Sequence, residues 1–320
     1  MTEASHLPQV SVVIATFNRP RLLTQTLRTI LAQDYPKERF EVLVVDNNSS
    51  PPARAVVESF ADSVPSPRWI LETTPGVSRA RNCGIQHARG DIIVFADDDV
   101  LAARDWLRKL VEPFHTAASR RIGAVGGTVL PVFPEGCPPW WRYTHPLQLS
   151  DRAEPLSSGQ ERKLMGANLA VTKAALNEVG GFRTDLGRRG LALLDGEEPD
   201  LLSRIRAAGF EIWFAGQAVV QHQMPLSRLT LRYACRSAFD SARSRVIDRL
   251  GTGSLSRSRR VGYCVARLLG NFMLLSVFLL GAVFCGLIAQ IGWAKGFVVR
   301  FCRSAGYVIQ MVALAINRKT

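Results

Sequence analysis

The segment Ile92–Asp99 constrains the fold most, because an apolar run leads directly into three consecutive aspartates, Asp97, Asp98 and Asp99. The β-branched and aromatic residues of the run predict a buried strand. Ligands of open α/β sheets bind at the carboxyl ends of the strands, which is where these carboxylates lie. Three adjacent carboxylates repel one another unless a cation or hydrogen bonds compensate. The segment therefore predicts either a site for a divalent metal, Mg²⁺ or Mn²⁺, or a solvated acidic turn before the next helix.

Strand-like and helix-like segments alternate over the first 100 residues. The strand-like runs begin at Val10, Glu41, Arg68 and Ile92. The helix-like segments between them cover residues 21–33, 53–61 and 76–88. This alternation predicts βαβ units and a mostly parallel sheet. A dinucleotide-binding domain shares the pattern, but no G-x-G-x-x-G follows the first strand and no G-x-x-x-x-G-K-[ST] occurs in the chain.

A second acidic cluster, Glu197, Glu198 and Asp200, lies about 100 residues after the first. A helix-like segment, Leu201–Ala208, follows it and ends at Gly209. Acidic residues at a helix N-terminus stabilise the positive end of the helix dipole. The cluster therefore has two interpretations: its carboxylates stabilise the start of a helix, or one of them has a catalytic role.

Six segments occur in a specific order along the chain. They are S-V-V-I-A-T-F-N-R-P, V-V-D-N-N-S-S, G-V-S-R-A-R-N-C-G-I-Q-H-A-R-G-D-I-I-V-F-A-D-D-D, G-A-N-L-A-V-T-K-A-A-L-N-E-V-G-G-F, G-E-E-P-D-L-L-S-R-I-R-A-A-G-F-E-I-W-F and a histidine at 222. Together, over residues 9–235, they resemble family 2 of the inverting glycosyltransferases. The resemblance implies an α/β fold: a GT-A-type nucleotide-sugar-binding domain with a mostly parallel mixed sheet.

The resemblance also implies a site for a nucleotide-diphosphate sugar. Thr16, Asn18 and Asp46 match positions that line the nucleobase and ribose pocket. Either Arg79 or Arg81 would lie near the nucleotide, and Arg81 fits the family pattern better. Asparagine and threonine at turns also have ordinary capping roles, so these positions keep a structural alternative.

The acidic triplet matches the D-x-D motif of the family. Asp97 and Asp99 are its outer carboxylates, with Asp99 the expected direct metal ligand and Asp97 nearer the ribose; Asp98 takes the variable middle position beside the nucleotide sugar. His222 matches a position that often completes the metal or diphosphate shell, although a histidine ending an apolar strand can be purely structural. Asn168 belongs to the segment that lies beneath the transferred sugar.

Inverting transfer is a single displacement at the anomeric carbon, and one carboxylate must accept the proton of the acceptor hydroxyl. The family usually shows Glu-Asp where this chain has Glu197 and Glu198. Glutamate at the usual aspartate position makes Glu198 the expected base, with Glu197 and Asp200 as alternatives. A divalent cation would stabilise the leaving nucleoside diphosphate.

The C-terminal part of the chain differs sharply in charge. Residues 226–320 contain 15 lysines and arginines against two acids, a net charge of +13 that equals that of the whole chain. Between Arg267 and Lys295 lie 27 residues without charge, enough to span a bilayer. A basic tract can bind nucleic acid, but one that flanks so long an apolar run indicates a membrane instead. We therefore expect no nucleic acid partner, and the flanking arginines predict the cytoplasmic face of the cell membrane.

These observations predict three parts: a catalytic domain over residues 1–225, a basic helical linker over 226–260 and membrane-associated helices over 261–320. A Gly/Ser/Arg-rich hinge is expected at 251–260. The apolar run 268–294 is the expected span, while an in-plane or re-entrant hairpin is the alternative, because arginines interrupt the segment that follows.

The predicted function is inverting transfer of a sugar from a nucleotide-diphosphate sugar to a lipid-linked or surface-polysaccharide acceptor. One alternative is a polyprenyl-phosphate glycosyltransferase, whose acceptor is already anionic and needs no base. The other is a membrane-tethered protein that binds sugar nucleotides without catalysis.

Overall fold

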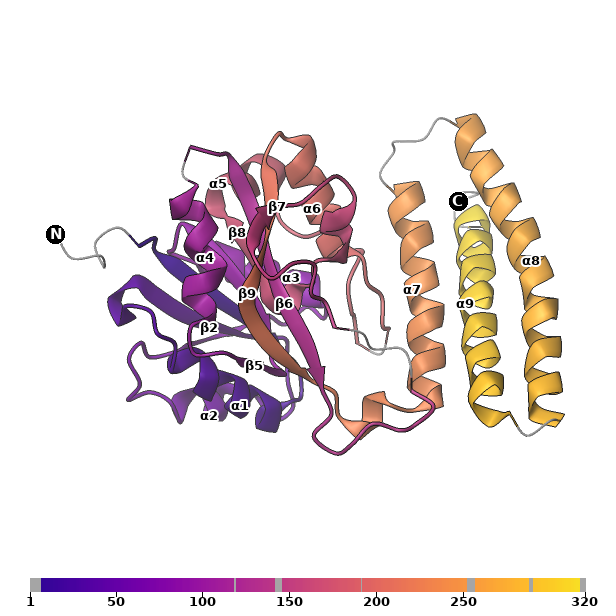
Figure 1. Ribbon diagram of the computed structural model, residues 1–320, viewed down its shortest axis with the longest axis horizontal. Coiled ribbons are helices and arrows are strands. Elements are labelled where there is room, and N and C mark those ends of the chain that lie inside the picture. Colours follow the sequence, from indigo (N-terminus) through magenta and orange to yellow (C-terminus); the bar gives the residue numbers. More distant parts are fainter. Residues whose placement is uncertain are drawn as a thin grey trace. The chain divides into compact units, whose positions relative to one another are not determined.

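A computed structural model describes residues 7–117, 119–141, 146–190, 192–251, 257–287 and 290–316 (Figure 1). The chain divides into two compact units. The first comprises residues 1–132, 145–184 and 197–223, and the second comprises 133–144, 185–196 and 224–320. The last segment of the second unit thus begins near the change in charge, while its two earlier segments come from within residues 1–225.

A nine-stranded mixed sheet forms the centre of the first unit, in the order β3-β2-β1-β4-β8-β6-β9-β5, with β7 paired to β9. Its first four strands in the chain are β1 (Val10–Thr16), β2 (Phe40–Asp46), β3 (Arg68–Leu71) and β4 (Ile92–Asp97). These four are parallel, as the alternating sequence pattern predicts. Strands β1, β2 and β4 are almost entirely buried, whereas β3 is only half-buried.

The remaining strands make the sheet mixed. They are β5 (Val100–Ala102), β6 (Ile122–Val132), β7 (Ala153–Pro155), β8 (Leu169–Thr172) and β9 (Glu211–Gln223). Strand β8 lies antiparallel between β4 and β6, and the short β5 and β7 pair antiparallel with β9.

The helices of the first unit are α1 (Pro20–Leu31), α2 (Arg54–Glu58), α3 (Val77–His87), α4 (Trp106–Thr116), α5 (Lys173–Val179) and α6 (Glu197–Ala207). Helix α1 begins with proline, and its Leu23, Leu27 and Ile30 recur at helical spacing and are fully buried. Helix α2 is shorter than the segment 53–61 that the sequence predicts. Short 3₁₀ turns complete the unit: η2 (Lys37–Arg39), η3 (Gln160–Lys163) and η4 (Gly166–Asn168).

Strand register brings three separate segments to one edge of the sheet. Ala15 of β1 lies opposite Asp97 of β4, so the loop after β1 is next to the three aspartates. Val100 of β5 lies opposite His222 of β9, so that histidine is next to the same aspartates from the other side.

The second unit contains a further 3₁₀ turn, η5 (Leu226–Arg228), and three long helices, α7 (Leu231–Gly251), α8 (Arg257–Leu287) and α9 (Ile291–Ile316). Helix α9 packs against both α7 and α8. The expected span 268–294 is not one helix, because α8 ends at Leu287 and α9 begins at Ile291. Of the expected hinge, residues 257–260 belong to α8, while 252–256 lie outside the described residues. Within the described chain, Val265–Leu287 is the one helical stretch long and apolar enough to cross a membrane.

Candidate active site

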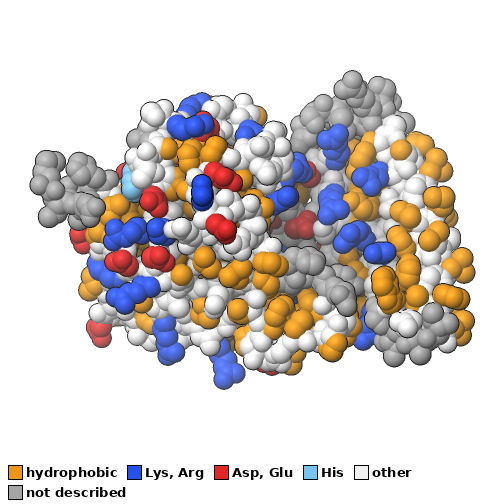
Figure 2. All heavy atoms as spheres, in the orientation of Figure 1, with side chains coloured by type: hydrophobic (Ala, Val, Ile, Leu, Met, Phe, Trp, Pro, Cys, Tyr) orange, Lys and Arg blue, Asp and Glu red, His pale blue; other side chains and the backbone are white. Residues whose placement is uncertain are grey.

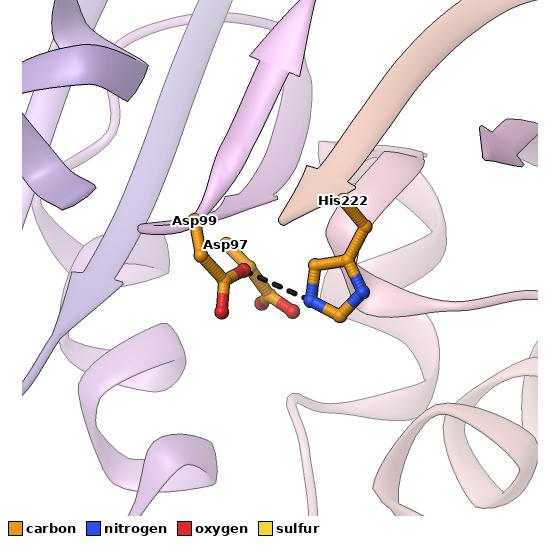
Figure 3. A group of neighbouring side chains, drawn as sticks. All are labelled: Asp97, Asp99 and His222. Carbon is orange, nitrogen blue, oxygen red and sulfur yellow. Dashed lines mark ion pairs between the residues drawn. The ribbon is translucent and has the colours of Figure 1, made fainter. Parts of the chain in front are cut away.

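Two carboxylates and an imidazole converge at the carboxyl edge of the sheet (Figure 3). Asp97 ends β4, Asp99 lies in the turn to β5, and His222 comes from the end of β9. Their ligand atoms lie within 4.8 Å of one another, and His222 Nε2 is 2.9 Å from Asp99 Oδ1. Carboxylate oxygens suit Mg²⁺ or Mn²⁺, and the imidazole adds a third donor. This donor set fits a divalent cation.

Asp98 points toward β1 and ties the acidic turn to that strand. Its Oδ2 accepts a hydrogen bond from Thr16 Oγ1 at 2.8 Å, and its Oδ1 lies 2.9 Å from Arg19 Nη1. The same Arg19 nitrogen is 3.0 Å from Asp99 Oδ2. Burial raises the pKa of Asp98 to about 6, against the opposing effect of Arg19. Arg19 thus compensates part of the repulsion that three adjacent carboxylates create.

Arg81 joins the two acidic clusters. It projects from α3, is 4% exposed, and places Nη2 3.1 Å from Asp97. Its Nη1 lies 3.1 Å from Glu197 and 2.9 Å from Glu198. Burial opposes the charge of Arg81, but the carboxylates of Glu198, Asp97 and Glu197 outweigh burial and raise its pKa above the ordinary value. A buried, permanently charged guanidinium therefore holds both clusters in one site.

Glu198 is the most accessible carboxylate of the second cluster. Its side chain is 15% exposed, compared with 7% for Glu197, and its Oε1 also accepts a hydrogen bond from the backbone N–H of Gly166 at 3.1 Å. Asp200, by contrast, is enclosed by Arg183 at 3.2 Å and Arg204 at 2.8 Å. Helix α6 starts at Glu197, four residues before the segment that the sequence predicts, so the acids also occupy its first turn.

The loop η4 fits closely against this ion-pair cluster. A Cβ atom on Gly166 would lie 2.5 Å from Glu198 Oε1 and would overlap the Arg81 guanidinium. Two residues on, Asn168 donates to the carbonyls of Thr128 and Ala218 and accepts from the Trp106 indole. The Asn168 amide therefore fixes the loop to the surrounding strands and α4.

The residues expected at the nucleotide lie in and after β1 and β2. Asp46 is fully buried, and its oxygens accept from the backbone N–H groups of Ser49 and Ala53. Asn18, at φ 55°, accepts from the Ser50 N–H. Asp46 and Asn18 therefore shape the two adjoining loops at the edge of the sheet.

Sequence reasoning missed Arg19, although a signal was available. A cation was required near the aspartates, and Arg19 follows the strand that pairs with theirs. Arg79, the other arginine considered, forms no ion pair with any residue that the structure describes.

Residues 11–164 match the family model described as Glycosyl transferase family 2. The chain is 29% identical to the Succinoglycan biosynthesis protein ExoM of Rhizobium meliloti, over 73% of each chain. It is 27% identical to a Glucosyl-dolichyl phosphate glucuronosyltransferase of Haloferax volcanii, over 76% of this chain and 78% of the relative.

Among solved structures, the mannosyltransferase PcManGT from Pyrobaculum calidifontis, in complex with GDP-Man and Mn²⁺, aligns with a TM-score of 0.63 at 21% identity. The alignment covers 100% of this chain and 90% of that one. At this level of identity the likeness establishes the fold, which is that of a GT-A glycosyltransferase.

Proposed function

We propose that the chain catalyses inverting, metal-dependent transfer of a sugar, since residues 11–164 match the model of Glycosyl transferase family 2 and the fold is of the GT-A type. The donor is a nucleotide-diphosphate sugar, and the acceptor is a lipid-linked saccharide or a growing surface polysaccharide. The observation that carries the proposal is the pairing of two acidic clusters through Arg81, one suited to a metal and the other to a base.

Asp97, Asp99 and His222 would hold the divalent cation, with Asp99 as the central ligand. Such a cation, when bound, neutralises charge on the departing nucleoside diphosphate. Arg19 keeps Asp99 oriented toward the site. The relative solved with GDP-Man and Mn²⁺ supports this assignment.

Glu198 acts as the general base in this proposal. Its carboxylate accepts the proton of the acceptor hydroxyl as that oxygen attacks the anomeric carbon, and the bond to the diphosphate breaks on the opposite face of the sugar. Arg81 and the Gly166 N–H hold Oε1, which fixes the direction of the carboxylate. Thr16, Asn18 and Asp46 shape the loops proposed to receive the nucleoside.

The second unit and the relatives support the proposal of a lipid-linked acceptor and a membrane location. Residues 226–320 carry the +13 net charge, and only 6% of the most apolar 18 consecutive residues within Val265–Leu287 are buried. Anionic headgroups attract such a basic segment, and its arginines favour the cytoplasmic face. Two relatives are named for succinoglycan biosynthesis and for a dolichyl-phosphate-linked sugar, which supports acceptors of this class.

The test is a panel of nucleotide-diphosphate sugars incubated with full-length protein, Mn²⁺ and a lipid extract from the producing cell. We expect release of nucleoside diphosphate from one donor, dependent on both the metal and the extract. The anomeric configuration of the product, determined by NMR, should be opposite to that of the donor. Release that continues in excess chelator, or a product with retained configuration, would contradict the proposal.

A further inference from the structure

We propose that α8 lies in the plane of the membrane, with its face opposite α9 embedded in one leaflet, rather than crossing the bilayer. This inference rests on the membrane part of the proposed function and specifies its geometry. The partner is a lipid surface with anionic headgroups. The three helices of the second unit are in a register that places arginine side chains beside α8.

The embedded face is a set of exposed apolar side chains that runs along α8 from Val265 to Leu287. Its members include Val265, Leu269, Phe272, Leu280, Phe284 and Leu287, of which Leu287 is 81% exposed. Figure 2 shows apolar side chains gathered over α8 and α9, with lysine and arginine side chains in a band over α7. Exposed apolar surface this continuous is unusual on a soluble protein and marks an interaction site.

The apolar length alone would permit a crossing. Val265–Leu287 has 23 residues, so as a helix it is about 34 Å long, close to the roughly 30 Å thickness of the hydrocarbon core. A crossing α8 would therefore fill the core from one side to the other, and any helix packed along it would enter the same depth.

Two contacts fix how α9 runs along α8. The rings of Phe278 and Phe297 lie 6.4 Å apart, and the Arg267 guanidinium lies 5.1 Å from the ring of Tyr307. The helices are therefore antiparallel. Arg300 and Arg303, both exposed, fall between these contacts and so lie level with the middle of the apolar stretch.

Helix α7 also packs against α9. Arg243 Nε lies 3.0 Å from Gln310 Oε1, and Gly306 packs closely against the Phe239 backbone, so α7 runs parallel to α9. This register places the exposed Arg232 and Arg236 level with the first half of the apolar stretch of α8.

A crossing would thus place several exposed arginines at hydrocarbon depth, which membranes strongly disfavour. An in-plane α8 avoids this cost. Packed helices lie about 8–10 Å apart, and interfacial helices insert their apolar face by about 5–10 Å. With α8 embedded, α9 lies at the level of the headgroups and α7 beyond them, where their arginines meet anionic lipid.

Depth-dependent quenching tests the proposal with the full chain bound to vesicles of phosphatidylcholine and phosphatidylglycerol. An environment-sensitive fluorophore is attached at Leu269→Cys, Ser276→Cys or Leu287→Cys, in a chain whose native cysteines are replaced by alanine. Arg303→Cys serves as the matched control on α9. Circular dichroism checks that each variant keeps its helices, and quenching is compared between lipids with shallow and with deep nitroxides.

We expect the three α8 positions to be quenched alike, more by the shallow than by the deep nitroxide, and Arg303→Cys to be quenched less than these three positions and by the shallow nitroxide alone. A crossing helix would give strongest deep quenching at Ser276→Cys and shallow quenching at both ends, which would overturn the proposal. Absence of quenching at all three positions would also overturn the proposal, because it would show that α8 does not enter the membrane. Neither result depends on sugar transfer. Failure of the membrane proposal can therefore be distinguished from failure of the catalytic proposal.

Discussion

Arg81 Nη1 lies 2.9 Å from Glu198 Oε1, while the second terminal nitrogen of Arg81 contacts Asp97. One buried guanidinium thereby connects the carboxylate proposed as base with a carboxylate proposed as metal ligand. The arrangement fixes the two acidic groups relative to one another without bringing like charges into direct contact.

Replacing Glu198 with glutamine should lower kcat by about 10²–10⁴-fold, because the amide retains the shape of the side chain but cannot accept a proton. Donor binding, measured by calorimetry in the presence of Mn²⁺, should be unchanged. The comparison variants are Glu197→Gln and Asp200→Asn.

If either comparison variant loses that much turnover while Glu198→Gln does not, the base is misassigned. If all three keep high turnover, the acceptor brings its own negative charge, as a polyprenyl phosphate would.

Replacing Asp99 with asparagine should weaken Mn²⁺ binding and lower kcat by about 10²–10³-fold, since the diphosphate loses electrostatic stabilisation as it departs. Titration of Mn²⁺ against donor-dependent turnover measures both effects. Asp34→Asn is the control, because Asp34 is a surface aspartate, 60% exposed and paired with Arg108. Equal Mn²⁺ dependence in the two variants would exclude Asp99 as a ligand.

The local parts of this site could be predicted from the sequence. Strand β4 and its aspartates follow from a short apolar run and its polar end, and the fold class follows from the alternation around it. The link through Arg81 could not be predicted in this way, because it depends on how α3 and α6 pack across the sheet. Arg183 likewise meets Asp200 only in the folded chain, whereas Arg204 lies four residues after Asp200 on the same helix, a spacing that does predict an ion pair.

The C-terminal helices show a different limit of prediction from sequence. The predicted span 268–294 is defined by the absence of charged residues. That absence indicates an apolar environment, but it does not indicate where a helix ends. The break between Leu287 and Ile291 carries no proline or charge to mark it. The register that places arginines of α7 and α9 beside α8 is a tertiary property.

Replacing Gly166 with alanine should impair the site without removing any charged group. The new Cβ would lie 2.5 Å from Glu198 Oε1, and the Arg81 guanidinium it also overlaps is held by three carboxylates. We expect a loss of about 1–3 kcal/mol in unfolding free energy from overpacking, together with reduced kcat. Gly262→Ala is the control, since a Cβ there meets open space. Wild-type stability and turnover in Gly166→Ala would show that the cluster shifts freely.

Replacing Asp240 with alanine should destabilise the segment that leads into the second acidic cluster. Asp240 is buried on α7, accepts a hydrogen bond from the Leu193 N–H at 2.8 Å and pairs with Arg243 at 3.1 Å. Leu193 lies four residues before Glu197, so the helix holds the chain just ahead of the cluster. Truncation leaves the half-buried Leu193 N–H without its acceptor, at a cost of about 1 kcal/mol in thermal or denaturant unfolding.

Asp240→Asn is the matched variant for this prediction, because its carbonyl oxygen can still accept from the Leu193 N–H. It should recover most of the stability that Asp240→Ala loses, even though the charge facing Arg243 is gone. Equal destabilisation by the two substitutions would mean that the ion pair with Arg243, and not the hydrogen bond to the segment 185–196, is what Asp240 contributes. In that case Asp240 would not anchor the chain that precedes Glu197, and the hydrogen bond from the Asp195 N–H to Ser244 Oγ would be the remaining attachment to α7.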